Sequence, residues 1–182
     1  MHLIWYTAMS MDGRIADPSD DLAFLESIDA EGEPEDEFDR FIDGVDAVLI
    51  GGTTLRWLVA GGHGWPHADL PTWLLSSDEH LLTAIGPTDA PIHQRSGEIV
   101  PVLDEIAAAG HDRVWLAGGG SVAGQALAAD RIDEVVVTIA PTALGAGAAL
   151  FDAPDLPARR FTRTEVRPYG TDGVRISWSR AR

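Results

Sequence analysis

The most informative segment of this chain is Val114-Trp-Leu-Ala-Gly-Gly-Gly-Ser121, which runs directly into Val122-Ala-Gly-Gln-Ala-Leu-Ala-Ala129. An apolar strand ends there in three glycines and a serine, and a helix begins at once. The first N–H groups of a helix have no intrahelical partner, and the helix dipole is positive at the same end. Such a turn favours a phosphate, because glycine lets the backbone approach the anion closely. Close packing of a strand against a helix would need the same glycines, so both interpretations stay open.

The composition is that of a globular protein, with 182 residues, 45% of them hydrophobic and 23% charged. We expect one domain over residues 1–182. The chain has no cysteine, which fits a reducing cytoplasm and excludes thiolate chemistry. Apolar runs stay well short of the roughly 18 residues of a membrane span, and the N-terminus lacks the pattern of a signal peptide. These features predict a cytoplasmic protein without a membrane partner.

The formal net charge is −16, and all 13 basic residues are arginine. A nucleic-acid partner is not expected, because neutralising phosphates needs a basic face. The overall field also repels anionic ligands, so any such ligand must be held by local donors.

Strand and helix patterns alternate along most of the chain, and the end is rich in strand patterns. Hydrophobic patterning predicts strands at 3–8, 46–50, 71–77, 91–94, 113–117, 133–140, 161–166 and 173–179. It predicts helices at 22–28, 35–43, 98–109 and 121–129, with a further helix starting at 53. This order indicates an α/β sandwich whose sheet is mainly parallel, with an antiparallel C-terminal edge.

Three of the predicted strands end in glycine or hydroxyl residues. They are Ile50-Gly-Gly-Thr-Thr54, Leu75-Ser-Ser77 and Ala117-Gly-Gly-Gly-Ser121. Ligands of open α/β sheets bind beyond the carboxyl ends of strands, so three such ends favour a long phosphorylated ligand such as a dinucleotide. The G-x-G-x-x-G fingerprint is missing, and a P-loop is excluded because the chain has no lysine.

Taken in order, five segments resemble the dihydrofolate-reductase-like superfamily, a three-layer α/β sandwich. Within it, the chain is most similar to the reductase half of the bifunctional riboflavin-biosynthesis deaminase-reductase and its stand-alone relatives, through the S-x-D-G-x-I-A block at 10–16. The segments are Ala8-Met-Ser-Met-Asp-Gly-Arg-Ile-Ala16, Val48-Leu-Ile-Gly-Gly-Thr-Thr54, Leu70-Pro-Thr-Trp-Leu-Leu-Ser-Ser77, Trp115-Leu-Ala-Gly-Gly-Gly-Ser-Val122 and Val135-Val-Val-Thr-Ile-Ala-Pro141.

The resemblance implies a reductase that takes a hydride from NADPH and delivers it to a small heterocycle, pterin-like or aminopyrimidine-like. It implies that Ala8 and Ile15 flank the nicotinamide, that Ser76 and Ser77 meet the adenosine 2′-phosphate, and that Thr138 helps to bind the substrate ring. The residues expected at the pyrophosphate are Gly51, Gly52, Thr53, Thr54, Gly118, Gly119, Gly120, Ser121 and Val122.

Two further roles follow from the resemblance. Dihydrofolate reductases carry an acid on an early helix that supports protonation of the substrate; the candidates are Asp36, Glu37 and Asp39, and we favour Asp36. Asp12 is expected as a turn former near the site and, with Thr138, among the residues that bind the substrate.

Dihydrofolate reductases also have a basic residue at the position of Gly52. Arg56 or Arg95 is a candidate to supply that charge here.

Other interpretations stay open at this point. The chain could be a nucleotide-binding module without catalysis, or a reductase that uses a flavin or deazaflavin. His63 and His67 lack a nearby third ligand, so no metal site is expected. The resemblance also implies a homodimer, for which the alternating Val174, Ile176 and Trp178 offer a face that could equally pack on the chain's own helices.

Overall fold

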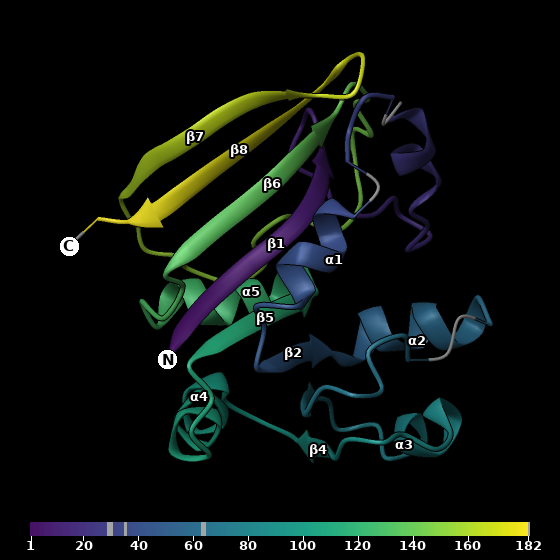
Figure 1. Cartoon of the computed structure of the whole chain (residues 1–182), viewed down its shortest axis with the longest axis vertical. Coiled ribbons are helices and arrows are strands. Elements are labelled where there is room, and N and C mark those ends of the chain that lie inside the picture. Colours follow the sequence, from purple (N-terminus) through teal and green to yellow (C-terminus); the bar gives the residue numbers. More distant parts are fainter. Residues whose placement is uncertain (29–30, 35, 63–64, 182) are drawn as a thin grey trace.

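The structure is a computed structural model that describes residues 1–28, 31–34, 36–62 and 65–181. Figure 1 shows one sheet with helices packed around it. The strands are β1 (His2–Ser10), β2 (Ala47–Gly51), β3 (Thr72–Leu75), β4 (Ile92–Arg95), β5 (Arg113–Gly118), β6 (Glu134–Ala140), β7 (Phe161–Tyr169) and β8 (Gly173–Arg180). The α-helices are α1 (Glu37–Ile42), α2 (Gly52–Ala60), α3 (His80–Ile85), α4 (Ile99–Ala108) and α5 (Gly120–Ala128), and a 3-10 helix η1 spans Ala23–Ser27.

The sheet has eight strands in the order β4-β3-β2-β5-β1-β6-β8-β7. Strands β1 to β6 pair in parallel, whereas β8 runs antiparallel to β6 and β7 antiparallel to β8. The predicted mixed sheet with an antiparallel C-terminal edge is therefore confirmed. Helices connect the parallel strands, whereas a tight turn is enough to join β7 to β8.

Both faces of the sheet are covered, which explains why the central strands are apolar runs without alternation. On one face, Leu3 and Trp5 of β1 pack with Leu103 of α4 and Ala123 of α5. On the other face, β2 and β3 pack against α1, α2 and α3, with Leu55 of α2 fully buried. The sheet therefore forms the middle layer of three.

The structure differs from the expected elements at three places. The helix predicted at 22–28 is the 3-10 helix η1, in which only Phe24 is buried. Helix α3 was not predicted, because six residues with the single buried Leu81 give too short a pattern for a helical period. The helix predicted from Glu35 begins at Glu37 among the described residues, and Glu35 itself lies outside them.

Within the described part of the chain, none of the helices combines the length and the apolar character needed to cross a bilayer.

The core between α4 and the sheet offers a test of the fold. Leu103 is fully buried, so replacing it with alanine removes apolar contacts and leaves a cavity. We expect Leu103→Ala to lower the free energy of unfolding by about 2–5 kcal/mol, measured by urea denaturation. Leu82→Ala on α3 is the matched control, because Leu82 is 37% exposed, and it should cost less than about 1 kcal/mol. Equal losses would contradict this placement of α4.

Candidate active site

A groove of about 530 Å³ runs over the ends of β2, β3 and β5, and we call it the strand-end groove. It also receives Trp5 and Thr7 from β1. The structure thus brings the three predicted strand ends together along one cavity. The sequence-predicted residues that line it are Ile15, Gly51, Gly52, Thr53, Thr54, Ser76, Ser77, Gly118, Gly119, Gly120, Ser121 and Val122.

The glycines of this groove are needed for packing between the two strand–helix turns. A Cβ on Gly51 would lie 2.9 Å from Cγ2 of Val122, and a Cβ on Gly118 would lie 2.5 Å from Oγ1 of Thr54. A Cβ on Gly52 would lie 2.6 Å from Oγ of Ser76. The backbone can approach these neighbours so closely only because glycine, which has no Cβ, occupies positions 51, 52 and 118. The packing interpretation of the glycine run applies here alongside the anion interpretation.

The groove offers neutral hydrogen-bond donors. Helices α2 and α5 begin at Gly52 and Gly120, and their N-caps, Gly51 and Gly119, carry no side chain that could cap the helix. The N–H groups of each first turn have no acceptor within their own helix, and the helix dipoles are positive there. The hydroxyls of Thr53, Thr54, Ser76, Ser77 and Ser121 line the same cavity.

A second cavity of about 410 Å³ adjoins the groove, and we call it the Arg175 pocket. Thr7 of β1 and Ala117, near the end of β5, line both cavities, so the two cavities meet at these residues. Ala8 and Thr138, which the sequence assigned to the nicotinamide and to the substrate, both line the Arg175 pocket. They are direct partners in the pairing of β1 with β6.

Arg175 is the charged wall of this pocket and is only 6% exposed. It lies opposite Thr138 in the pairing of β6 with β8, and its Nε donates to Thr138 Oγ1 at 2.8 Å. Its guanidinium carbon lies 4.2 Å from the ring centre of Tyr169 and 5.2 Å from that of Tyr6. Burial of this cation is thus balanced by a hydroxyl, two aromatic faces and an acid described next.

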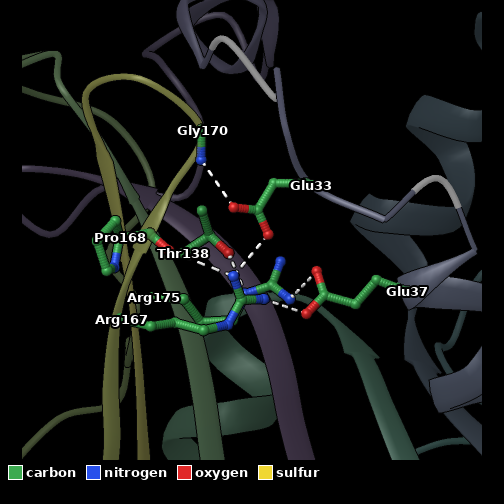
Figure 2. A network of polar contacts seen from close by, with 7 residues as sticks. All are labelled: Glu33, Glu37, Thr138, Arg167, Pro168, Gly170 and Arg175. Atoms are coloured by element: carbon green, nitrogen blue, oxygen red, sulfur yellow. Dashed lines mark hydrogen bonds and ion pairs between the residues drawn. The ribbon is translucent and has the colours of Figure 1, made fainter.

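Figure 2 shows that Glu37 joins two arginines. Its Oε2 accepts from Nη1 of Arg175 at 2.5 Å, and its Oε1 pairs with Nη2 of Arg167. Arg167 Nη1 also donates to Glu33 at 2.5 Å, and Glu33 accepts from the N–H of Gly170. These two contacts hold the pKa of Glu33 below its ordinary value, the Gly170 hydrogen bond more strongly. This series of ion pairs, from Glu33 through Arg167 and Glu37 to Arg175, thus links α1 and the segment before it to the β7–β8 hairpin.

Aromatic rings form the remaining wall of the Arg175 pocket. Tyr6 stacks on Phe41 with ring centres 4.4 Å apart, and Phe38 meets Trp115 edge-on at 5.3 Å. Burial raises the pKa of Tyr6 above its ordinary value, so its phenol stays protonated and can donate a hydrogen bond at neutral pH. The pocket therefore combines flat apolar walls with donors from Tyr6 and Arg175.

The structure does not bring Asp36 to either cavity. Its carboxylate pairs with Arg40 at 2.7 Å on the exposed side of α1. The neighbouring Glu37 is the acid of this helix that reaches Arg175, which itself lines the pocket. The catalytic role assigned to Asp36 has no geometric support here.

Asp12 also lies outside both cavities. It accepts from Ser10 Oγ and from the N–H groups of Leu144 and Gly145. These hydrogen bonds, the one from Ser10 first, lower its pKa to about 2. The carboxylate therefore ties the loop after β1 to the loop after β6, whose Ala148 lines the strand-end groove. Asp12 therefore organises a turn near the groove, and the structure does not bring it to the pocket that Thr138 lines, where a substrate was expected.

Sequence reasoning missed Arg175, Arg167, Glu33 and the choice of Glu37. No local pattern marks Arg175. The alternation of Val174, Ile176 and Trp178 indicates that the face of β8 opposite to Arg175 is the buried one, whereas the structure buries the face that holds Arg175. Within the described residues, no three histidine, cysteine or acidic side chains are grouped as metal ligands; His63 lies outside those residues.

Comparison with known proteins gives the class of protein to which this fold belongs. A protein of Shewanella sp. PV-4 assigned to riboflavin biosynthesis is 25% identical, with a TM-score of 0.83 and complete coverage of both chains. The diaminohydroxyphosphoribosylaminopyrimidine deaminase/5-amino-6-(5-phosphoribosylamino)uracil reductase of Thermotoga maritima is 15% identical with a TM-score of 0.71. That match covers 99% of this chain and 56% of the Thermotoga chain.

A dihydrofolate reductase of Enterococcus faecalis, solved with NADP(H), is 16% identical with a TM-score of 0.60, over 98% of this chain and 96% of that one. The three-layer architecture is thus dihydrofolate-reductase-like, as the sequence predicted. The model of the RibD C-terminal domain family matches residues 1–174, and the chain belongs to that family. The family is one of reductases of the riboflavin-pathway type.

Glu37, the first residue of α1, and Asp36, the N-cap residue before it, provide a test of the charge network. Glu37→Gln removes the charge that Arg175 and Arg167 share, and Arg175 stays buried. We expect a loss of about 1–3 kcal/mol in the free energy of unfolding, because a buried cation loses its anion. Asp36→Asn at the neighbouring N-cap position is the matched control and should cost less than about 1 kcal/mol, because its ion pair with Arg40 is exposed. Urea denaturation measures both, and a larger loss for Asp36→Asn would contradict the network.

Proposed function

We propose that this chain is an NADPH-dependent reductase that transfers a hydride to a small heterocyclic acceptor, pterin-like or aminopyrimidine-like. The observation that supports this most is the junction of the two cavities at Thr7 and Ala117. A long ligand in the groove and a ring in the Arg175 pocket would adjoin at that junction. Membership of the RibD C-terminal domain family supports the same assignment.

The donor set of the strand-end groove fits a dinucleotide diphosphate. The first turns of α2 and α5 would hold the two phosphates through Thr53, Thr54, Gly120 and Ser121, without using any cation. When bound, NADPH supplies the hydride from its nicotinamide ring. Ile15 lines the groove and Ala8 the adjoining pocket, so the protein offers apolar contacts on both sides of the junction.

The Arg175 pocket would hold and orient the acceptor. Aromatic walls suit a flat ring, and Thr138 lies on the pocket floor with its hydroxyl accepting from Arg175. Both carboxylate oxygens of Glu37 are paired with guanidinium groups, so the geometry assigns this acid to positioning Arg175. The protonated phenol of Tyr6 is the pocket group best suited to donate a hydrogen bond to the acceptor.

The placement of Asp36 and Glu37 favours a second candidate, a nucleotide-binding module without catalysis. Asp36 lines neither cavity and pairs with Arg40, and both carboxylate oxygens of Glu37 are paired with arginines. If an acid at this helix is essential for turnover, the chain would bind coenzyme and reduce nothing. Absorbance at 340 nm separates the two candidates, because only a reductase oxidises NADPH in the presence of pterins or aminopyrimidines. A yellow purified protein would instead indicate a flavin.

We also propose a cytoplasmic homodimer, with the heterocycle and coenzyme as its small-molecule partners. Val174, Ile176 and Trp178 of β8 are only half-buried by their own chain, which leaves apolar surface for a second copy. Light scattering of the purified protein tests this through its molar mass. A monomer at micromolar concentration would contradict it.

Coenzyme binding is the direct test of the proposed function. NADPH should raise the melting temperature in a concentration-dependent way, because it binds only the folded state. Ser121→Glu places a negative charge in the first turn of α5 inside the groove, so it should weaken NADPH binding by about tenfold or more. Isothermal calorimetry measures the dissociation constants.

Val100→Glu is the matched control, because it adds the same charge to the first turn of α4, outside both cavities. It should leave NADPH binding unchanged within about twofold. No melting shift of the unmodified protein with saturating NADPH or NADH would contradict the proposed function.

A further inference from the structure

We propose that Arg56 makes this protein select NADPH over NADH, by binding the phosphate on the 2′-oxygen of the adenosine ribose. The proposal rests on the proposed function, because it assigns one end of the same groove. It names the residue that replaces the basic side chain absent at Gly52.

The geometry of α2 places Arg56 beside the serines at the end of β3. Gly52 and Arg56 are four residues apart and therefore lie on the same face of the helix, one turn from each other. Gly52 packs directly on Ser76, as a Cβ there would lie 2.6 Å from Ser76 Oγ. Arg56 follows one turn further along that face, and it lines the groove with Ser76 and Ser77.

Arg56 is the only cation among the described residues that line the groove, whereas Asp20 and Asp152 contribute acids to it. A dianionic phosphate in a protein of net charge −16 needs a local positive charge, since the overall field repels it. The other candidate, Arg95, donates to both carboxylate oxygens of Glu105 at 2.7 and 2.6 Å and does not line the groove. Arg95 is therefore committed elsewhere.

The present partner of Arg56 can be exchanged. Arg56 Nη2 meets Asp78 Oδ2 at 3.3 Å, and the two side chains are 55% and 35% exposed. An exposed ion pair of this kind contributes little free energy, so a phosphate with more charge and more acceptor oxygens can take the guanidinium. Asp78 stays close by, because its own N–H donates to Ser76 Oγ at 3.1 Å.

A preference for NADH over NADPH would need Asp78, and not Arg56, to line the groove. In NAD-binding sites an acid accepts a hydrogen bond from the ribose 2′-hydroxyl and repels a phosphate there. Here Arg56 lines the groove and Asp78 does not. The side that the groove presents to the ribose is thus the cation and two serine hydroxyls, which is the donor set that a phosphate requires.

The experiment measures dissociation constants of NADPH and NADH by calorimetry for the unmodified protein and four variants. Arg56→Gln should weaken NADPH binding by about tenfold and change NADH binding by less than about twofold. Arg56→Lys keeps the charge and should keep most of the preference. Asp78→Asn removes the competing acid and should tighten NADPH binding by about two- to fivefold without affecting NADH.

Arg131→Gln is the matched control, because it produces the same net charge as Arg56→Gln by removing an arginine that pairs with Asp104 outside both cavities. It should leave both constants unchanged. Melting temperatures report whether each variant folds.

Three outcomes overturn the proposal while leaving the proposed function intact: the unmodified protein binds both coenzymes equally, it prefers NADH, or Arg56→Gln weakens both to the same extent. If the unmodified protein binds neither coenzyme, the proposed function fails first and this proposal fails with it. A loss of preference in Arg56→Gln that Arg131→Gln does not share supports the assignment.

Discussion

The close approach of two strand–helix turns is the constraint on which the rest of the molecule depends. Strands β2 and β5 are neighbours in the sheet, and the helices that follow them begin at their ends. Gly51 fits against Val122 and Gly118 against Thr54, with no space for a Cβ at either glycine. Both helix N-termini therefore open into one groove. The donors of this groove come from backbone packing, so a phosphate site here would need no lysine and would tolerate a strongly acidic chain.

The Arg175 pocket follows a different principle, in which charge is buried and then compensated. Arg175 is nearly inaccessible, and such a cation is stable only with partners that replace its water. The partners that replace water around Arg175 are the Thr138 hydroxyl, two tyrosine rings and the Glu37 carboxylate. Because Glu37 comes from α1 and Arg175 from β8, the pocket also fastens a helix from early in the chain to the last strand. Because both carboxylate oxygens of Glu37 are used in these ion pairs, neither is left to contact a ligand.

Residues of the groove could be predicted because each belongs to a short motif whose local geometry fixes its position. A strand that runs into glycines and then a helix puts Gly119 or Ser121 at a sheet edge whatever the rest of the chain does. The choice between Asp36 and Glu37 depends on how the segment before α1 meets the β7–β8 hairpin, which local patterns do not encode. On β8, the apolar alternation of Val174 and Ile176 drew attention to the half-exposed face, while the buried face holds Arg175 and Ser177.

The two sites also differ in how they resist the net charge of −16. Donors in the first turns of α2 and α5 act over the length of a hydrogen bond, where the field of distant carboxylates is weak beside a direct contact. In the Arg175 pocket, the acids Glu37 and Glu33 cancel the positive charges of Arg175 and Arg167, so a ligand there meets little net field. That balance suits a neutral ring held by its shape and by single hydrogen bonds. Under the proposed function, this division of charge would direct the phosphorylated coenzyme to the helix N-termini of the groove and the flat acceptor to the Arg175 pocket.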